Sequence, residues 1–378
     1  MTIQGKLIAT TLVFIAAAAS VQAAPTVSVS TFATGSGVSA TTTGPDSITT
    51  GNGSVWVEYG NGADSTGASG GSTIVQYSPG GTVQHVYPIA GLVDGLKFNP
   101  VTGMVWALQN NDGNSTLSII NPTAHSVSAP LSYASPPYVY GASSSRGYDD
   151  VAFLGGKVYM SYSNPVNPTD SVVQMLTQGN TPSGTLTTTN ILTAQQGGLT
   201  SSANEPDIDS LKSTPNGALV LTTEGDGPGC CDPVGEFTLI KNPGASQTVT
   251  NVPVTSGGNN VKGIDDVIFP GATSGWLYVA ETGTANKVDK VWLSGLDPNM
   301  AIVAIGGLSE VALVNPTNGD VGTALLSGLS SPHGMDFVPA ASAPEPSTWP
   351  MLLLGVGGLA VAAAARRQRA ASCLATAN

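Results

Sequence analysis

Aspartate recurs at regular intervals along this sequence, each time beside an apolar residue and ahead of a turn. The intervals between the first five copies are 48, 55, 58 and 58 residues, and a histidine follows the last aspartate after 68 residues. Several carboxylates that converge on one point suit a hard cation such as Ca²⁺. The residues at these places are Asp46, Asp94, Asp149, Asp207, Asp265 and His333.

A plainer interpretation of the same aspartates stays open. An aspartate side chain before a turn often accepts hydrogen bonds from nearby backbone N–H groups, and a repeat reproduces this arrangement in every copy. The two interpretations differ in geometry. Carboxylate oxygens about 2.3–2.6 Å from a common point favour the cation, whereas side chains turned back to their own backbone favour the structural role.

Acidic residues and one histidine also form a candidate catalytic set. Glu58, Glu224 and Glu281 follow or end the second strand of their copies and would face the same point as the aspartates. The candidate catalytic residues are His333, Glu224 and Glu281. The sequence contains no phosphate-binding loop, dinucleotide fingerprint or zinc-ligand spacing.

Each copy supplies strands that would position these side chains. The first copy reads Pro45–Ile48, then a turn at Gly51–Gly53, then the aromatic strand Val55–Tyr59. One or two further strand-like segments follow each copy, and no long helical period occurs. About four strands in every 50 or so residues are typical of β-propeller blades, which stack on one another and close into a ring.

The sequence therefore predicts an all-β fold, a single β-propeller of five to seven blades with six favoured, over residues 25–340. In the fifth copy, Ile264–Val267 is expected to lead into the next strand of the same blade, Trp276–Val279. The segment Thr26–Phe32 is a candidate to complete the last blade beside Pro332–Val338. A β-sandwich or a parallel β-solenoid is the main alternative.

Composition restricts the partners of this domain. Between Ala24 and Ala343 the chain has eight Lys and Arg against 23 Asp and Glu, a formal balance of −15. Such a surface repels phosphate backbones, so no nucleic acid is expected as a partner, and it attracts cations. Cys230 and Cys231 are adjacent, and a bridge between them would close a strained ring. They are either a redox- or metal-sensitive spot or an incidental pair in a loop.

The N-terminus has the layout of a secretory signal peptide. Lys6 precedes an apolar run, Leu7–Ala19, and small residues follow up to Ala24. A membrane anchor or a buried helix is the alternative, but the run is shorter than the roughly 20 residues that a span requires. We expect residues 1–24 to be removed on export.

The C-terminus has three parts in a fixed order. Pro344, Glu345 and Pro346 lie in a linker of residues 341–348, an apolar segment follows, and an arginine cluster closes it. Residues 349–369 are expected to form a transmembrane helix of barely sufficient length with a positive cytoplasmic stop, and residues 370–378 a short tail. The stop consists of Arg366, Arg367 and Arg369.

This order resembles the PEP-CTERM sorting signal, also known as the ice-binding-protein C-terminal motif. The resemblance implies export across the inner membrane and transient membrane anchoring. It also implies recognition by an exosortase-type membrane peptidase and final placement at the cell surface or outside, often with exopolysaccharide. The nine residues after the arginines depart from the family pattern, and an ordinary C-terminal anchor is the alternative.

The first copy of the repeat resembles those of NHL-type, streptogramin-lyase-like and gluconolactonase-like propellers. The gluconolactonase likeness implies a cation that polarises a lactone and a carboxylate that acts as base. Streptogramin lyases use cleft histidines, for which only His333 is a candidate here. We expect a non-enzymatic propeller that binds or has a structural role in the envelope or exopolysaccharide matrix. The alternative is a cation-dependent hydrolase or lactonase, with Ca²⁺ as the possible cofactor.

Overall fold

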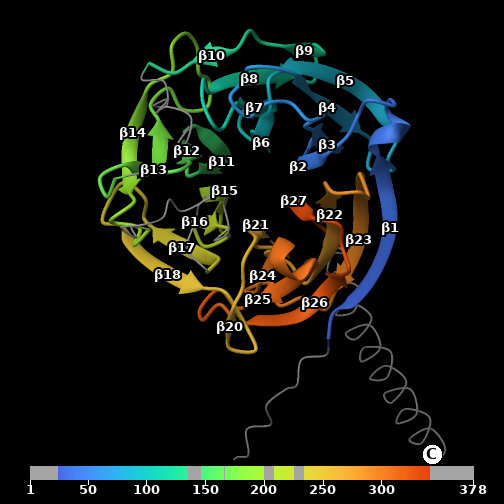
Figure 1. Cartoon of the computed structure of the whole chain (residues 1–378), viewed down its shortest axis with the longest axis vertical. Coiled ribbons are helices and arrows are strands. Elements are labelled where there is room, and N and C mark those ends of the chain that lie inside the picture. Colours follow the sequence, from blue (N-terminus) through green and yellow to red (C-terminus); the bar gives the residue numbers. More distant parts are fainter. Residues whose placement is uncertain (1–23, 135–145, 166, 200–207, 225–233, 341–378) are drawn as a thin grey trace, which may run out of the picture.

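The structure, a computed structural model, describes residues 24–340 apart from 135–145, 166, 200–207 and 225–233. Within these residues, six β-sheets stand as blades around one axis (Figure 1). The predicted all-β propeller with six blades is therefore confirmed. The only helical elements in the described part are two 3₁₀ turns, η1 (Gly35–Gly37) and η2 (Gly306–Leu308).

The first four blades follow the chain in order, and the first strand of each is innermost (Figure 1). Blade 1 contains β2 (Pro45–Gly51), β3 (Ser54–Tyr59), β4 (Gly71–Tyr77) and β5 (Val83–Ala90). Blade 2 contains β6 (Val93–Phe98), β7 (Val105–Gln109) and β8 (Thr116–Asn121), with the short β9 (Ser126–Val127) and β10 (Leu131–Ser132) both paired to β8. Blade 3 contains β11 (Tyr148–Leu154), β12 (Lys157–Tyr162), β13 (Ser171–Leu176) and β14 (Thr188–Thr193). Blade 4 contains β15 (Ile208–Ser213), β16 (Ala218–Thr223), β17 (Glu236–Lys241) and β18 (Thr248–Pro253), and a small hairpin of β19 (Thr255–Ser256) and β20 (Asn259–Asn260) follows.

Blades 5 and 6 exchange strands. The innermost strand of blade 5, β21, pairs with β24 and not with the next strand in the chain. The intervening hairpin β22–β23 crosses into blade 6, where β22 pairs with β27. The prediction that Ile264–Val267 and Trp276–Val279 share a blade is therefore wrong, although both are strands. The bounds are β21 (Ile264–Ile268), β22 (Ser274–Glu281), β23 (Lys287–Ser294), β24 (Ala301–Ile305), β25 (Glu310–Val314), β26 (Val321–Ser327) and β27 (Pro332–Pro339).

The first strand of the chain closes the ring. Strand β1 (Thr26–Thr34) is the outer strand of blade 6 and pairs with β23. It joins the last blade as predicted, but at the edge opposite β27 and not beside it. The first and last strands of the propeller thus lie in the same sheet, so the ring cannot open without the loss of a complete strand pairing.

The core lies between the blades. Six buried apolar clusters fill the six interfaces between neighbouring blades. Side chains alternate along each strand, so Val57 of β3 packs towards blade 6 while its neighbour Trp56 packs towards blade 2. Each fully buried side chain of this size stabilises the fold by about 1.5–3 kcal/mol, and the clusters together hold the innermost strands at fixed distances.

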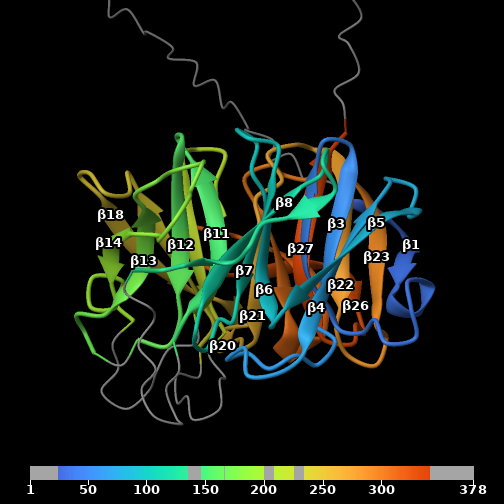
Figure 2. The ribbon, with the colours of Figure 1, turned by 90° about the horizontal axis from the view of Figure 1, so that it is seen from above.

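The innermost strands approach each other closely near one end of the axis. A Cβ on Gly95 would lie 2.2 Å from the carbonyl oxygen of Asp149, and one on Gly334 would lie 2.3 Å from that of Asp46. Only glycine fits at these two places. In the side view, the strands run along the axis and the loops gather at its two ends (Figure 2). The residues just before these glycines lie at one of those ends.

Candidate functional site

Strand register identifies six equivalent positions around the channel. In all six blades, the residue before each position pairs with the end of the adjacent strand, as Pro45 pairs with Tyr59 and Tyr148 with Tyr162. A β-bulge follows in nearly every copy, and bulges re-aim side chains. The six positions hold Asp46, Asp94, Asp149, Asp209, Asp265 and His333. We call this set the acidic ring.

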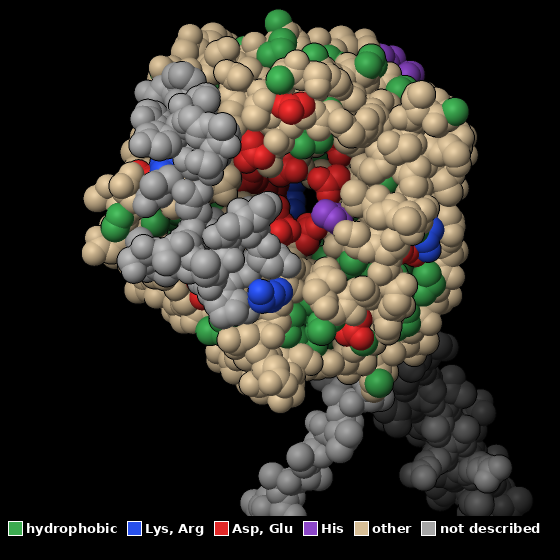
Figure 3. All heavy atoms as spheres, in the orientation of Figure 1, with side chains coloured by type: hydrophobic (Ala, Val, Ile, Leu, Met, Phe, Trp, Pro, Cys, Tyr) green, Lys and Arg blue, Asp and Glu red, His purple; other side chains and the backbone are tan. Residues whose placement is uncertain are grey.

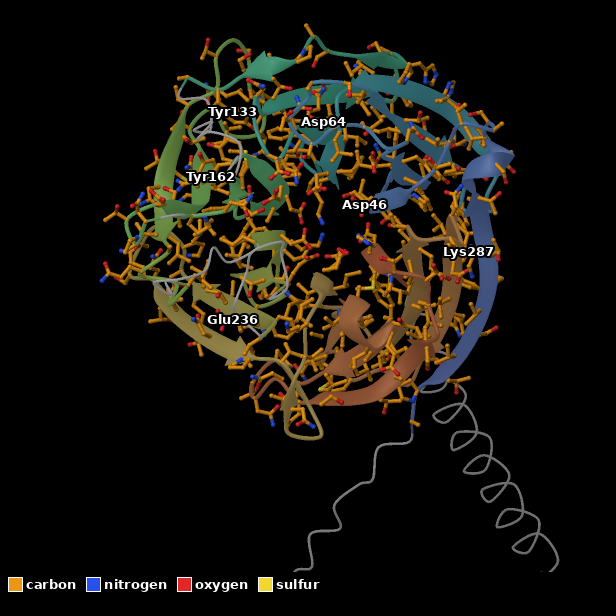
Figure 4. The ribbon with its side chains drawn as sticks, viewed as in Figure 1. Asp46, Asp64, Tyr133, Tyr162, Glu236 and Lys287 are labelled. Carbon is orange, nitrogen blue, oxygen red and sulfur yellow. The ribbon has the colours of Figure 1, made fainter. Side chains whose placement is uncertain are left out.

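The acidic ring lines a hollow on the face seen in Figure 3. Carboxylates surround the opening, a histidine lies at its edge, and a lysine or arginine side chain is visible in its depth. Asp46 lies beside this opening in Figure 4, whereas Lys287 lies further out in blade 6. The end of the axis that carries the acidic ring is the channel mouth.

One member of the predicted set, Asp207, lies outside the described residues. Among the described residues, the fourth ring position is occupied by Asp209, which follows Ile208 at the start of β15. The sequence contained the signal, because Asp209-Ser210-Leu211 repeats the order Asp46-Ser47-Ile48 of the first copy. The correct intervals around the ring are 48, 55, 60 and 56 residues between the aspartates.

Three carboxylates converge at the channel mouth. Side-chain oxygens of Asp209, Glu224 and Asp265 all lie within 4.8 Å of one another. Two ligands of one Ca²⁺ ion, each about 2.3–2.6 Å from it, can be at most about 5 Å apart. The cluster therefore has the donor type and spacing that this ion requires. Glu224 comes from the end of the second strand of blade 4, as expected.

Electrostatics at this cluster favour the binding of a proton or a cation. Burial raises the pKa of Asp209 well above its usual range, and the neighbouring Asp265 and Glu224 raise it further. Burial also raises the pKa of Asp265, against the effect of the His333 imidazolium. The Oδ2 atom of Asp209 is buried without a hydrogen-bond partner. A cation at this point would relieve both the crowding of charge and the unpaired oxygen.

His333 is fixed between two members of the ring. Its Nδ1 atom lies 3.0 Å from Asp46 and 2.7 Å from Asp265, and its Nε2 atom lies 3.0 Å from the Ser331 hydroxyl. Burial alone would lower the pKa of His333, but the carboxylates of Asp265 and Asp46 raise it to about 12. The imidazole is therefore protonated at neutral pH. It acts as a fixed positive charge and cannot accept a proton as a general base.

A second layer lies below the ring and was missed from the sequence. Lys212 of β15 lies 3.0 Å from Asp150 of blade 3 and 3.0 Å from Asp266 of blade 5. Burial disfavours the charged lysine, but these two carboxylates raise the pKa of Lys212 well above its usual range. Lys97 also belongs to this layer, and burial together with Lys212 lowers its pKa. Both lysines stand three residues after a ring aspartate, in Asp94-Gly95-Leu96-Lys97 and Asp209-Ser210-Leu211-Lys212, so two copies of the repeat contained a signal for them.

Within the channel, backbone N–H groups donate to the aspartates of this lower layer and of β27. Asp150 accepts from the N–H groups of Val151 and, across the blade boundary, Leu211. Asp266 likewise accepts from its own neighbour and from blade 6, and Asp336 from its own neighbour and blade 1. The structural role proposed for the repeated aspartates is thus performed by the residues beside or below the ring. No such bond is observed for Asp94 or Asp209 in the described residues.

Glu58 lies on the same side of the fold but has no solvent access. It is 0% exposed, and neither carboxylate oxygen has a hydrogen-bond partner of ordinary geometry among the described residues. Burial and then Asp46 raise the pKa of Glu58 well above its usual range, and the nearby Ser72 hydroxyl only partly offsets this effect. Because Glu58 has no exposed surface, it is not a ligand that reaches the mouth.

The three candidate catalytic residues do not all meet. His333 and Glu224 line one pocket of about 300 Å³ at the mouth, and the other lining residues are Gly263, Asp265, Gly306, Gly307, Ser331 and Pro332. Glu281 ends β22 of blade 6, next to β27, and is not among the residues that line this pocket. It contacts Lys287 at 2.8 Å and accepts from the N–H of Ser330. Glu281 therefore stabilises a loop of blade 6 and does not line the pocket.

Several predicted features lie outside the described residues. These are the signal peptide, the adjacent Cys230 and Cys231, and the C-terminal segment. The sorting residues Pro344, Glu345, Pro346, Arg366, Arg367 and Arg369 belong to that segment. In the described part of the chain, no helix has the length and apolar character needed to cross a bilayer.

Comparison with known proteins identifies the C-terminal segment. A model of the PEP-CTERM protein-sorting motif matches residues 342–368. No curated protein matches the chain. Two solved structures resemble the propeller at 11% identity each. Hydrazine synthase of Kuenenia stuttgartiensis has a TM-score of 0.42, with 72% of this chain and 77% of that chain covered. A luciferin-regenerating enzyme has a TM-score of 0.38, with 68% and 78% covered. Likeness at this level carries no argument about activity.

Proposed function

We propose that this protein is an exported β-propeller that binds a divalent cation, Ca²⁺, at its channel mouth. The observation that carries the proposal is the convergence of Asp209, Glu224 and Asp265 within 4.8 Å. The unpaired buried oxygen of Asp209 and the acidity of the surrounding ring support it. Hard cations prefer carboxylate oxygens, and flexible sites of six to eight oxygens are usual for Ca²⁺. Water and nearby backbone carbonyls would supply the remaining ligands.

The sorting motif suggests where the propeller works. A PEP-CTERM motif indicates an exported protein that an exosortase-type peptidase processes after transient membrane anchoring. We extend this to a signal peptide at residues 1–24, a membrane helix at 349–369, and release or display of residues 25–340 outside the inner membrane. The association with exopolysaccharide remains a prediction from the resemblance to this motif.

A cation-dependent hydrolase or lactonase is the second candidate. A cation beside a pocket of about 300 Å³ would polarise a bound carbonyl. However, the protonated His333 cannot act as a base, and Glu281 does not line the pocket. Any base would have to be a mouth carboxylate that the cation does not occupy, so the geometry supports binding more directly than catalysis.

Calcium-dependent stability tests the proposal. A ligand that binds only the folded state stabilises it by RT ln(1 + [L]/Kd), so 1 mM Ca²⁺ should add about 0.4–1.4 kcal/mol if Kd is about 10⁻⁴–10⁻³ M. Asp209→Asn should abolish this gain. Asp320→Asn, which removes the same charge in the β25–β26 turn far from the mouth, should retain it. Melting curves that do not respond to calcium or chelator would refute the cation site.

A further inference from the structure

Both ends of the propeller leave it on the face opposite the channel mouth. Strand β1 begins at Thr26, which pairs with Ser294, and β27 ends at Pro339, which pairs with Gly275. The other end of β27 carries His333 of the acidic ring. Because first and last strands share blade 6, the two exits lie close together. We call this side of the molecule the exit face.

Charge is divided between the two faces. The ring carboxylates lie on the mouth face. By strand order and register, so do Asp64, Asp112, Asp170, Glu236 and Glu310. On the exit face, the described turns and strands carry Lys157, Lys241 and Lys290 against Asp297 and Asp320. The exit face is thus the side of this acidic domain that an anionic surface would repel least.

A pair of tryptophans, one exposed and one half-buried, lies on the exit face near the two chain ends. Trp276 is 36% exposed and packs edge to face against Trp292, with ring centroids 5.0 Å apart. The Lys290 ammonium lies 4.4 Å from the Trp276 ring and donates to the carbonyl of Pro79. Tryptophan with a neighbouring lysine is the combination that membrane–water interfaces select, because the indole is apolar with one polar N–H.

The chain is short between this face and the sorting segment. The matched motif begins at residue 342, three residues after Pro339, and the apolar stretch begins at Trp349. Ten extended residues span at most about 35 Å. While the apolar stretch is inserted in a membrane, the exit face must therefore remain within about 35 Å of the bilayer surface.

We propose that the exit face rests on an anionic phospholipid bilayer while the chain is anchored. Trp276 and Trp292 would enter the headgroup region, the exit-face lysines would lie against lipid phosphates, and the acidic mouth would point away from the membrane. The proposal rests on the anchoring part of the proposed function and is independent of the cation site. Its ligand is the bilayer surface itself, not a soluble partner.

Labelling of lysines by a membrane-impermeant acylating reagent tests this orientation. The full chain is inserted into vesicles of phosphatidylcholine with about one third phosphatidylglycerol, and each lysine is scored by mass spectrometry against the protein in detergent. Lys157 and Lys241 should react about fivefold more slowly in the vesicles, because each lysine gains attraction near an anionic surface. Lys262, an exposed lysine on the mouth face, is the control and should react at an unchanged rate.

The outcomes separate the two proposals. A chain that does not float with the vesicles contradicts the anchoring. If the chain floats but Lys157, Lys241 and Lys262 all react as fast as in detergent, the exit face does not contact the bilayer. The proposal is then overturned, and the tryptophan pair would be available to a soluble partner. The double variant Trp276→Ser and Trp292→Ser should still float but lose most of the protection. Unchanged protection in this variant would also contradict the proposed contact.

Discussion

Replacing Lys212 with methionine removes the charge that holds two buried carboxylates inside the channel. The lysine side chain is 14% exposed, and those of Asp150 and Asp266 are 10% and 4% exposed. Methionine keeps the length and the apolar part of the side chain. The variant therefore tests the charge of the second layer and not its packing.

The expected loss follows from the partners that remain. Removing one member of a buried ion pair costs about 3–5 kcal/mol, because the other charge is left uncompensated. Asp150 and Asp266 keep their backbone N–H donors, so the loss should be near the lower value, about 3 kcal/mol. For a domain of roughly 300 residues, this corresponds to a fall in Tm of about 6 °C.

The pH dependence of this loss is a second readout. Burial disfavours the ionised form of Asp150, but Lys212 and Lys97 lower its pKa below the usual value. A lowered carboxyl pKa stabilises the fold above the unfolded-state value of about 3.9, and this contribution is lost as pH falls through the folded-state value. The difference between wild type and variant should be full above about pH 5 and should shrink below about pH 4.

Urea unfolding, followed by the fluorescence of the buried Trp56 and Trp106, measures the difference. Lys157→Met in the exposed β11–β12 turn is the matched control and should change stability by less than about 0.5 kcal/mol. If Lys212→Met were as stable as this control at pH 7, or if its loss did not depend on pH, the reasoning about the second layer would be refuted.

Three further predictions concern other parts of the fold. The His333 imidazole should stay protonated from pH 5 to pH 9 by NMR, because its pKa is raised to about 12. The protonated imidazole stabilises the fold fully below about pH 6.5, and this contribution is lost only towards pH 12. A titration midpoint near pH 6.5 would contradict the contacts of His333 with Asp46 and Asp265. Glu58→Gln should become increasingly more stable than wild type as pH rises above about 4.3. The Glu58 carboxyl then ionises in the unfolded state before it does in the fold, where burial raises its pKa, and this difference favours unfolding of the wild type. A Tm difference that is the same at pH 4.5 and 8.5 would argue against this. Phe32→Ala should lower the free energy of unfolding in urea by about 2–3 kcal/mol, because the phenyl ring packs edge to face on Tyr77 of blade 1 and Tyr278 of blade 6. A loss under about 0.5 kcal/mol would mean that β1 closes the propeller through its backbone pairing alone.

The repeat could be recognised in the sequence because every blade buries both faces against its neighbours. This requirement places apolar and aromatic residues such as Trp56 and Trp106 at the same phase in successive copies. The exchange of β22–β23 between blades 5 and 6 was not predictable from that pattern. A strand that packs in either blade needs the same alternation, and only the pairing partner differs.

The candidate site was predicted in part. Four of the five predicted aspartates and His333 occupy equivalent ring positions. The remaining position holds Asp209, and Asp207 lies outside the described residues. Lys212 has a counterpart in Lys97 of copy 2, but its pairing with Asp150 and Asp266 depends on contacts between blades, which a repeat in the sequence does not reveal. The position of Glu281 depended on the strand exchange, which carries it into blade 6.

A crystal structure of the protein grown with millimolar calcium would show directly whether the channel mouth binds the ion. We expect an ion about 2.3–2.6 Å from carboxylate oxygens of Asp209, Glu224 and Asp265. A calcium-free crystal should have no density peak at this point. A calcium-grown crystal without an ion there, with the three carboxylates bonded only to backbone and water, would contradict the proposed site.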